Sequence, residues 1–146
     1  MSLQLSRFLP AAPIRILIDQ KQQDLTAQFL HDELLEVDEK IETEQITDFI
    51  NGEQKNIKAM IANTEQKSAT IMQGIINQAN AEMLKVLAKE IKRLDALSKV
   101  NSGIKSAEIS ALKDIAIASH GYIKGAKLRL DAVRFIIAVR YRNLAV

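Results

Sequence analysis

The sequence contains no cysteine and no tryptophan, and only 2 prolines, 5 glycines and 2 histidines among its 146 residues. Without cysteine there is no disulfide, thiolate metal site or cysteine nucleophile, and this composition is typical of the cytoplasm. His31 and His120 stand far apart, which disfavours a histidine metal centre or catalytic triad. The glycines form neither a phosphate-binding loop nor a nucleophile elbow. We therefore expect no catalytic, cofactor or metal site in this chain.

Long hydrophobic runs are also missing. No stretch approaches the roughly 18 apolar residues of a membrane-spanning helix, and no basic region followed by an apolar stretch opens the chain. We expect no membrane partner and no secretion. The hydrophobic fraction of 47% in 146 residues is typical of one globular domain with its own core.

Charge is nearly balanced in total, at +2, but unevenly placed. Residues 31–54 carry nine acids and one base, Lys40. From Gly121 onward the chain carries six bases and one acid, Asp131. Two interpretations follow. Either the two regions lie against each other, or the basic end faces an anionic partner.

Alternating apolar residues predict sheet near the N-terminus. Leucines at even spacings in residues 3–9 and isoleucines at every second position in 14–18 indicate two β-strands. Pro10 and Pro13 fall between them, where a missing ladder donor matters least. We therefore predict a sheet over residues 3–20.

The region from Asp24 to about Gly125 predicts helices. Asp24 is a candidate N-cap, and Asn51-Gly52 marks an interruption. Beyond it, apolar residues recur at threes and fours, which is typical of a helix packed on another helix. The positions in this seam are Ile57, Ile61, Ile71, Ile75, Ala79, Met83, Leu87, Ile91, Leu94 and Ser98. A continuous helix over 65–99 would be on the order of 50 Å long.

A second helix follows a short turn. Gly103 ends the turn that begins at Val100, and Ser106 is a candidate cap. The second seam comprises Ile109, Leu112, Ala116, Ser119, Ile123 and Ala126. Because a short loop joins two apolar stripes, the sequence predicts an antiparallel helical hairpin.

The end of the chain is ambiguous between strand and helix. Leu130, Val133 and Ile137 would extend the helical seam, but residues 133–141 also alternate over β-branched and aromatic side chains. We favour a strand over about 128–142, because the N-terminal strands otherwise lack a third partner. The predicted fold class is therefore α+β, a small antiparallel sheet with a long antiparallel helical hairpin.

Basic residues supply the candidate contact site. Those on the first long helix lie opposite its apolar seam: Lys85, Lys89, Lys92, Arg93 and Lys99. The others lie near the chain end: Lys124, Lys127 and Arg129. Clustered cations on an accessible face can bind phosphate. Nearby Glu82, Glu90 and Asp95 could instead pair with them within the helix. No nearby aromatic side chain could stack on bases, so base-specific recognition of a single strand is disfavoured.

Four stretches carry a resemblance to a known family: Leu3–Pro10, Pro13–Asp19, Arg93–Leu97 and Leu128–Val139. In their order and spacing the chain resembles the C-terminal domain of the RapA (HepA) family. These are bacterial RNA polymerase-associated, Swi/Snf-type ATPases that recycle polymerase during transcription. The acidic stretch over residues 31–52 matches poorly, so its role here is open.

The resemblance implies a longer, ATP-dependent, helicase-like parent that translocates on DNA. Its ATPase lobes would precede this chain, so ATP and Mg would be bound by the parent, with no cofactor here. The implied partners are core RNA polymerase, DNA and the remaining domains of the parent. Met1-Ser2 would be an added start, and residues 3–146 a single accessory domain whose sheet the parent extends by one strand.

Two hypotheses follow. In the first, the chain is a non-catalytic domain that positions the ATPase on polymerase or nucleic acid, because a long hairpin carries a contact over tens of ångströms. In the second, it is a structural stalk or tether similar to a rotary ATPase stator. A stand-alone enzyme is disfavoured, because no nucleophile, base or metal set converges.

Overall fold

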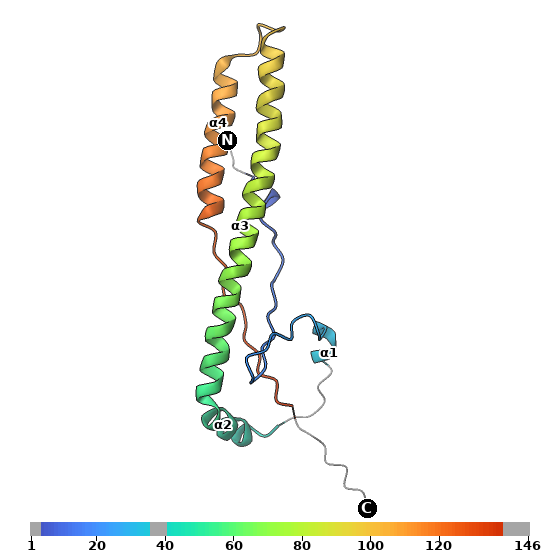
Figure 1. Cartoon of the computed structure of the whole chain (residues 1–146), viewed down its shortest axis with the longest axis vertical. Helices are drawn as coiled ribbons and strands as arrows, with labels where there is room; N and C mark the ends of the chain where they lie inside the picture. Colours follow the sequence, from blue (N-terminus) through green and yellow to red (C-terminus); the bar gives the residue numbers. More distant parts are fainter. Residues whose placement is uncertain (1–3, 36–40, 139–146) are drawn as a thin grey trace, which may run out of the picture.

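The computed structural model describes residues 4–35 and 41–138, and its main feature is a long helical hairpin (Figure 1). In chain order the helical elements are η1 (Leu5–Arg7), α1 (His31–Leu35), α2 (Thr43–Gly52), α3 (Gln54–Ser98) and α4 (Ser106–Lys124). The two long helices, α3 and α4, lie side by side and antiparallel. The remaining described segments run along this pair or gather at its lower end.

The predicted hairpin is confirmed, and its turn is tightly hydrogen-bonded. The Asn101 N–H donates to the Leu97 carbonyl at 2.8 Å, and the Asn101 side-chain oxygen accepts from the Gly103 N–H at 2.9 Å. The expected cap is wrong: Lys105, with extended backbone, occupies the N-cap position of α4, no side chain caps it, and Ser106 is the first helical residue. The backbone turn therefore defines the start of α4.

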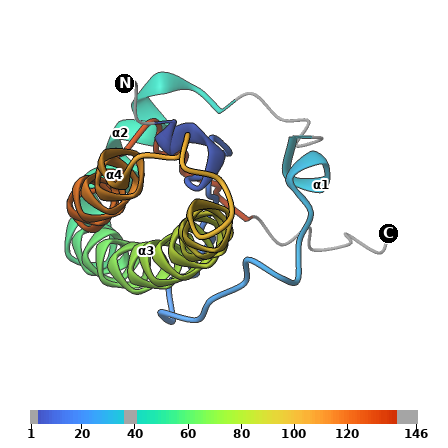
Figure 2. The ribbon, with the colours of Figure 1, turned by 90° about the horizontal axis from the view of Figure 1, so that it is seen from above.

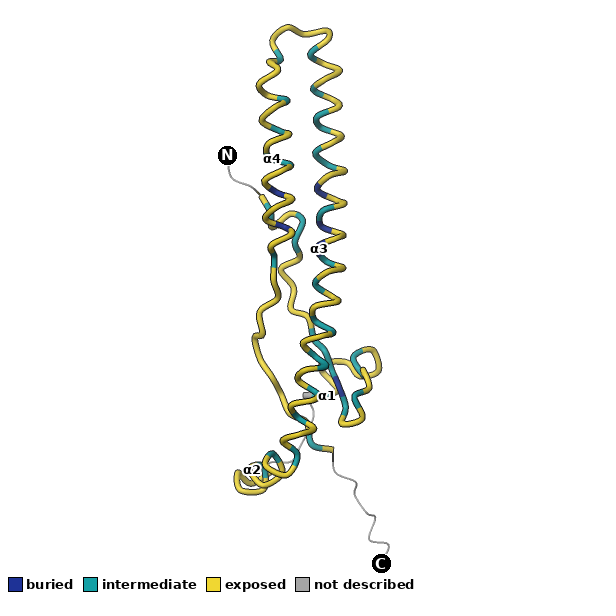
Figure 3. Tube along the Cα trace, turned by 60° about the vertical axis from the view of Figure 1, so that its left-hand side comes forward, coloured by how far each residue is buried: buried dark blue, intermediate teal, exposed yellow. Residues whose placement is uncertain are grey.

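The core is small and sits near the middle of α3. Ile76, Ala79 and Met83 of α3 and Ile123 of α4 form one cluster, and Met83 and Ile123 have no exposed surface. Leu5, Phe8 and Leu9 pack against this cluster from the N-terminal segment. Seen along the long axis, that segment covers one side of the helix pair (Figure 2). Burial is concentrated at this level of the hairpin (Figure 3).

The predicted seams match the observed burial in all but a few positions. The six seam positions predicted for the second helix are all buried or half-buried. Five of them, including the buried Ser119, lie in α4, and the sixth, Ala126, follows the end of that helix. In α3 the seam holds from Ala79 to Ser98. Ile61 and Ile71 are exposed, however, because no part of α4 reaches that level of α3.

The predicted N-terminal sheet is wrong. Residues 5–7 form a 3₁₀ turn, and the chain then runs along α3 without regular structure and reverses direction between Ile18 and Asp24. We call residues 10–30 the strap. The described residues contain no β-strand, only an isolated antiparallel bridge between Ile18 and Asp24. Period-two alternation fits a strap equally well, since an extended chain can bury one face against a helix without a ladder.

The predicted C-terminal strand is also wrong, as is the helical alternative. After Gly125 the described chain is extended to residue 138, without ladder or helix, and returns alongside α3 toward α2 (Figure 1). The remainder of the predicted strand, 139–142, lies outside the described residues. Residues 133–137 meet α2 and the first turn of α3 through apolar side chains. The fold class of the described chain is therefore helical, and the predicted α+β class is wrong.

The predicted helical region over 24–125 is confirmed only in part. Asp24 does not cap a helix; it lies in the strap, and the first helix beyond it is the short α1. The interruption at Asn51-Gly52 is confirmed, because α2 ends at Gly52 and α3 begins at Gln54. From there α3 runs without a break, so it is longer than the 65–99 helix predicted.

Candidate functional site: a basic stripe on the helical hairpin

A basic stripe lies on the upper half of α3: Lys85, Lys89, Lys92, Arg93 and Lys99. The lysine spacings of four, three and seven residues keep these side chains on one face of the helix. All are exposed, whereas Ala79 and Met83 are buried on the other face toward α4. The stripe therefore faces away from the second helix of the hairpin.

Two members of the basic stripe are neutralised by acids on the same helix. The Arg93 Nε donates to Glu90 Oε2 at 2.9 Å, and Lys99 Nζ lies 3.4 Å from Asp95 Oδ2. The hydrogen bond from Arg93 lowers the pKa of the Glu90 carboxyl and raises that of the Arg93 guanidinium. These two cations offer less charge to a partner.

The other three lysines keep their charge available. Over residues 4–35 and 41–138, no ion pair involves Lys85, Lys89 or Lys92. Glu82, which could have paired with the first two, makes no ion pair with them. These three exposed ammonium groups within two helical turns are the chemically free part of the stripe, suited to phosphates or to carboxylates on a protein surface.

The remaining predicted contact residues lie elsewhere. Lys124 ends α4, and Lys127 and Arg129 follow in the extended segment, all of them exposed. They belong to the other arm of the hairpin, whereas the basic stripe faces away from that arm. The structure therefore separates the predicted contact residues into two groups.

The acidic and basic regions of the chain lie beside a shared, mostly apolar groove. Ile46, Phe49 and Ile50 of α2 share a groove of about 410 Å³ with residues 133–137. Arg134 lines this groove, but no ion pair joins it to α2 in the part of the chain that the structure describes. The two regions thus contribute mostly apolar side chains to one groove. The acidic residues 36–39 lie outside the described residues.

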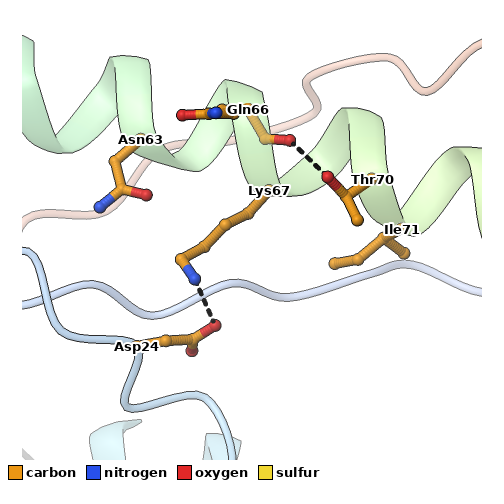
Figure 4. A pocket seen from close by; sticks show the side chains of 6 residues that line it. All are labelled: Asp24, Asn63, Gln66, Lys67, Thr70 and Ile71. Atoms are coloured by element: carbon orange, nitrogen blue, oxygen red, sulfur yellow. Dashed lines mark hydrogen bonds and ion pairs between the residues drawn. The ribbon is translucent and has the colours of Figure 1, made fainter.

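Sequence reasoning missed one polar junction, between the strap and α3 (Figure 4). Lys67 Nζ lies 3.3 Å from Asp24 Oδ2, and the Asn63 amide donates to the Gln22 side-chain oxygen at 3.2 Å. Hydrogen bonds from Thr26, followed by the ion pair with Lys67, lower the pKa of Asp24. The hollow beside the pair measures about 470 Å³ and is lined by exposed and half-buried side chains. Its contacts fasten the strap to α3, and no sequence spacing linked the two segments.

Neither a metal centre nor a membrane span is found in the described part of the chain. Among residues 4–35 and 41–138, no three histidine or acidic side chains gather closely enough to hold a metal ion. Within the same ranges, no helix combines the length and apolar character that crossing a membrane requires.

The described residues thus form a helical hairpin domain with further segments along it and an exposed row of lysines on one face. The chain belongs to the RNA polymerase recycling family, C-terminal domain, whose profile matches residues 1–138. This confirms the resemblance found in the sequence.

Relatives are the RNA polymerase-associated proteins RapA of several bacteria. The protein from Actinobacillus succinogenes is 35% identical over 138 residues, which is 94% of this chain and 14% of that protein. The protein from Pasteurella multocida is also 35% identical, over 93% of this chain and 14% of its own length. That from Pectobacterium atrosepticum is 30% identical over 92% of this chain, again 14% of its own length. The chain thus spans about 14% of the curated relatives that it matches.

Proposed function

We propose that this chain is the non-catalytic C-terminal domain of an RNA polymerase-associated ATPase that acts in polymerase recycling in the cytoplasm. Membership of the RNA polymerase recycling family supports this assignment. In this proposal, ATP and Mg bind other domains of the parent, which is helicase-like and translocates on DNA. The present domain positions that motor on core RNA polymerase or on its nucleic acid.

The observation that carries the proposal is the free part of the basic stripe. Lys85, Lys89 and Lys92 project from one face of a long helix whose opposite face is fixed by packing against α4. A helix held in this way presents cations in fixed register, so little backbone entropy is lost on binding. Their attraction for an anionic surface also speeds association at low salt.

The stalk hypothesis is not carried further. It predicts similarity to rotary ATPase stator proteins, whereas the similar proteins are named RNA polymerase-associated. No contact in the described residues favours a tether over an accessory domain.

The test is binding to core RNA polymerase and to duplex DNA at several salt concentrations. The variant combines Lys85→Glu, Lys89→Glu and Lys92→Glu. The matched control combines Lys55→Glu, Lys58→Glu and Lys113→Glu, which are exposed lysines outside the stripe. Each triple variant changes the net charge equally, so general electrostatics cancel in the comparison.

We expect the stripe variant to bind more weakly and with a shallower salt dependence than the control. If the lysines contact DNA phosphates, the slope of log K against log salt should fall by about 2.7, at about 0.9 per contact. Equal losses of affinity in both variants would mean that net charge, and not the position of the stripe, determines binding. Unchanged affinity and slope in the stripe variant would contradict a role for it. Circular dichroism verifies that each variant keeps its helices.

A further inference from the structure

The upper part of the hairpin extends well beyond the core. We call residues 84–118 the distal arm, because they lie beyond the buried Met83 and Ser119. In this arm the seam residues Leu87, Ile91 and Leu94 are only half-buried, and no further described segment lies beside the two helices (Figures 1 and 3). From Met83 to Ser98 the arm is about 20 Å long at 1.5 Å per residue. The buried residues of the core cluster all lie outside this arm.

An exposed apolar side chain stands at the end of the distal arm. We call residues 99–105 the tip, and in it Val100 is 83% exposed. Leu97 is 37% exposed beside it, and Ile104 is half-buried. Exposed aliphatic side chains are common singly, but this one lies in the turn that closes the end of the hairpin (Figure 1), next to two other apolar residues.

The backbone around Val100 is already ordered. The Val100 and Asn101 N–H groups both donate to the Leu97 carbonyl, at 3.1 and 2.8 Å. The Asn101 side chain then closes the turn onto Gly103. A Cβ at Gly103 would lie 3.0 Å from Asn101 Oδ1, so the turn is closely fitted. A preformed turn lowers the entropy lost when Val100 is buried by a partner.

Both charged residues of the tip are basic. Lys99 and Lys105 flank Val100, and no acid occurs between Asp95 and Glu108. Asp95 holds Lys99 at 3.4 Å, while Lys105 makes no ion pair within the described residues. The N-terminus of α4 begins at Ser106 and adds its partial positive charge. The tip is therefore an apolar knob within a positive field.

We propose that the tip is a protein-docking knob, in which Val100 enters an apolar pocket rimmed by carboxylates on core RNA polymerase. The proposal rests on the proposed function only for the identity of this partner. A protein pocket suits the tip better than nucleic acid, because an aliphatic side chain gains most from a dry apolar site. Lys99 is already held by a carboxylate, and no aromatic ring at the tip could stack on a base.

The test measures binding of the 146-residue chain to core RNA polymerase. Val100→Asp should weaken binding at least tenfold, because it removes the apolar anchor and brings a negative charge toward carboxylates. The matched control is Ile117→Asp, the same kind of change at a side chain that is 72% exposed on α4. The control should bind as the unchanged chain does.

A second variant separates docking from folding. Lys105→Glu places an acid at the N-terminus of α4, where a negative charge favours the helix, so the turn is retained. We expect slower association at low salt and a smaller difference at high salt. A photoreactive phenylalanine analogue replacing Val100 should cross-link to a polymerase subunit.

The possible outcomes are distinct. If the unchanged chain binds polymerase and Val100→Asp binds equally well, the docking knob is wrong and the proposed function stands. If the unchanged chain does not bind polymerase at all, both proposals fail. Equal loss in Ile117→Asp, or cross-linking at position 100 to duplex DNA instead of polymerase, would also overturn the knob.

Discussion

Met83 of α3 and Ile123 of α4 pack in the same core cluster, and neither side chain has any exposed surface. They are the only fully buried large side chains in the described part of the chain. The tightest packing between α3 and α4 therefore lies at this level of the hairpin.

Ile123→Ala is expected to lower the free energy of unfolding by about 2–5 kcal/mol, because it removes buried methyl groups and leaves a cavity. Urea denaturation followed by circular dichroism measures this loss. Ile117→Ala on the exposed face of the same helix is the control and should stay within about 0.5 kcal/mol. Similar losses in the two variants would mean that the core lies elsewhere.

The lowered pKa of Asp24 leads us to expect that the stability of the fold depends on pH. The folded pKa of this carboxyl lies below the ordinary value of 3.8, mainly through hydrogen bonds from Thr26. A lowered carboxyl pKa stabilises the fold above the ordinary value, and this contribution is lost as the pH falls through the folded pKa. Asp24→Asn, which keeps an acceptor for Thr26, should therefore be less stable than the unchanged chain at neutral pH and equally stable in strong acid.

Urea midpoints between pH 2 and 7 test the Asp24 prediction. Lys67→Met removes only the ion pair, and should reproduce a smaller part of the effect, because the bonds from Thr26 remain. A difference between Asp24→Asn and the unchanged chain that does not close in acid would contradict the assignment.

Asn101 is expected to hold the turn between the long helices. Asn101→Ala removes the acceptor for the Gly103 N–H and should cost about 1 kcal/mol. Amide hydrogen exchange should quicken over residues 100–104, while amides near Met83 keep their protection. Asn101→Asp retains the acceptor and should restore slow exchange; failure to do so would argue against this hydrogen bond.

The groove that α2 shares with residues 133–137 leads to a prediction about the stability of that segment. Phe49→Ser should loosen residues 133–137 from α2, because Phe49 lines the groove that they share. Trypsin cleavage after Arg134, which lines the same groove, should quicken, with little change in amide exchange around the core. Thr47→Ser, on an exposed residue of the same helix, is the control. Uniform loss of protection in Phe49→Ser would show that α2 and the core unfold together.

The hairpin was predictable because its information is local. Apolar residues at threes and fours identify both seams, and Gly103 marks the turn between them. The basic stripe was predictable for the same reason: helical spacing alone places Lys85, Lys89 and Lys92 opposite Met83. Which cations remain unpaired was not predictable, since Glu82 and Glu90 have equally suitable spacings, and only Glu90 forms an ion pair.

The sheet could not be rejected from sequence. Alternation in residues 14–18 predicts one covered side, and of its isoleucines Ile18 is buried, Ile16 half-buried and Ile14 exposed. Such alternation does not indicate whether the surface that covers these side chains belongs to another strand or to a helix. The strap's attachment through Asp24 and Lys67 joins segments 43 positions apart, a relationship that periodicity does not contain.

The position of the core along α3 has a mechanical consequence. Ile76 lies midway between Gln54 and Ser98, so the helix continues for similar lengths on both sides of its fixed point. A tilt of about 10° around that pivot would move Val100 by on the order of 5 Å, given 1.5 Å per residue. The α2 end would swing the opposite way. A rigid α3 pivoting there would act as a two-armed lever, so that a displacement of the tip would be accompanied by an opposite displacement of the end that carries α2.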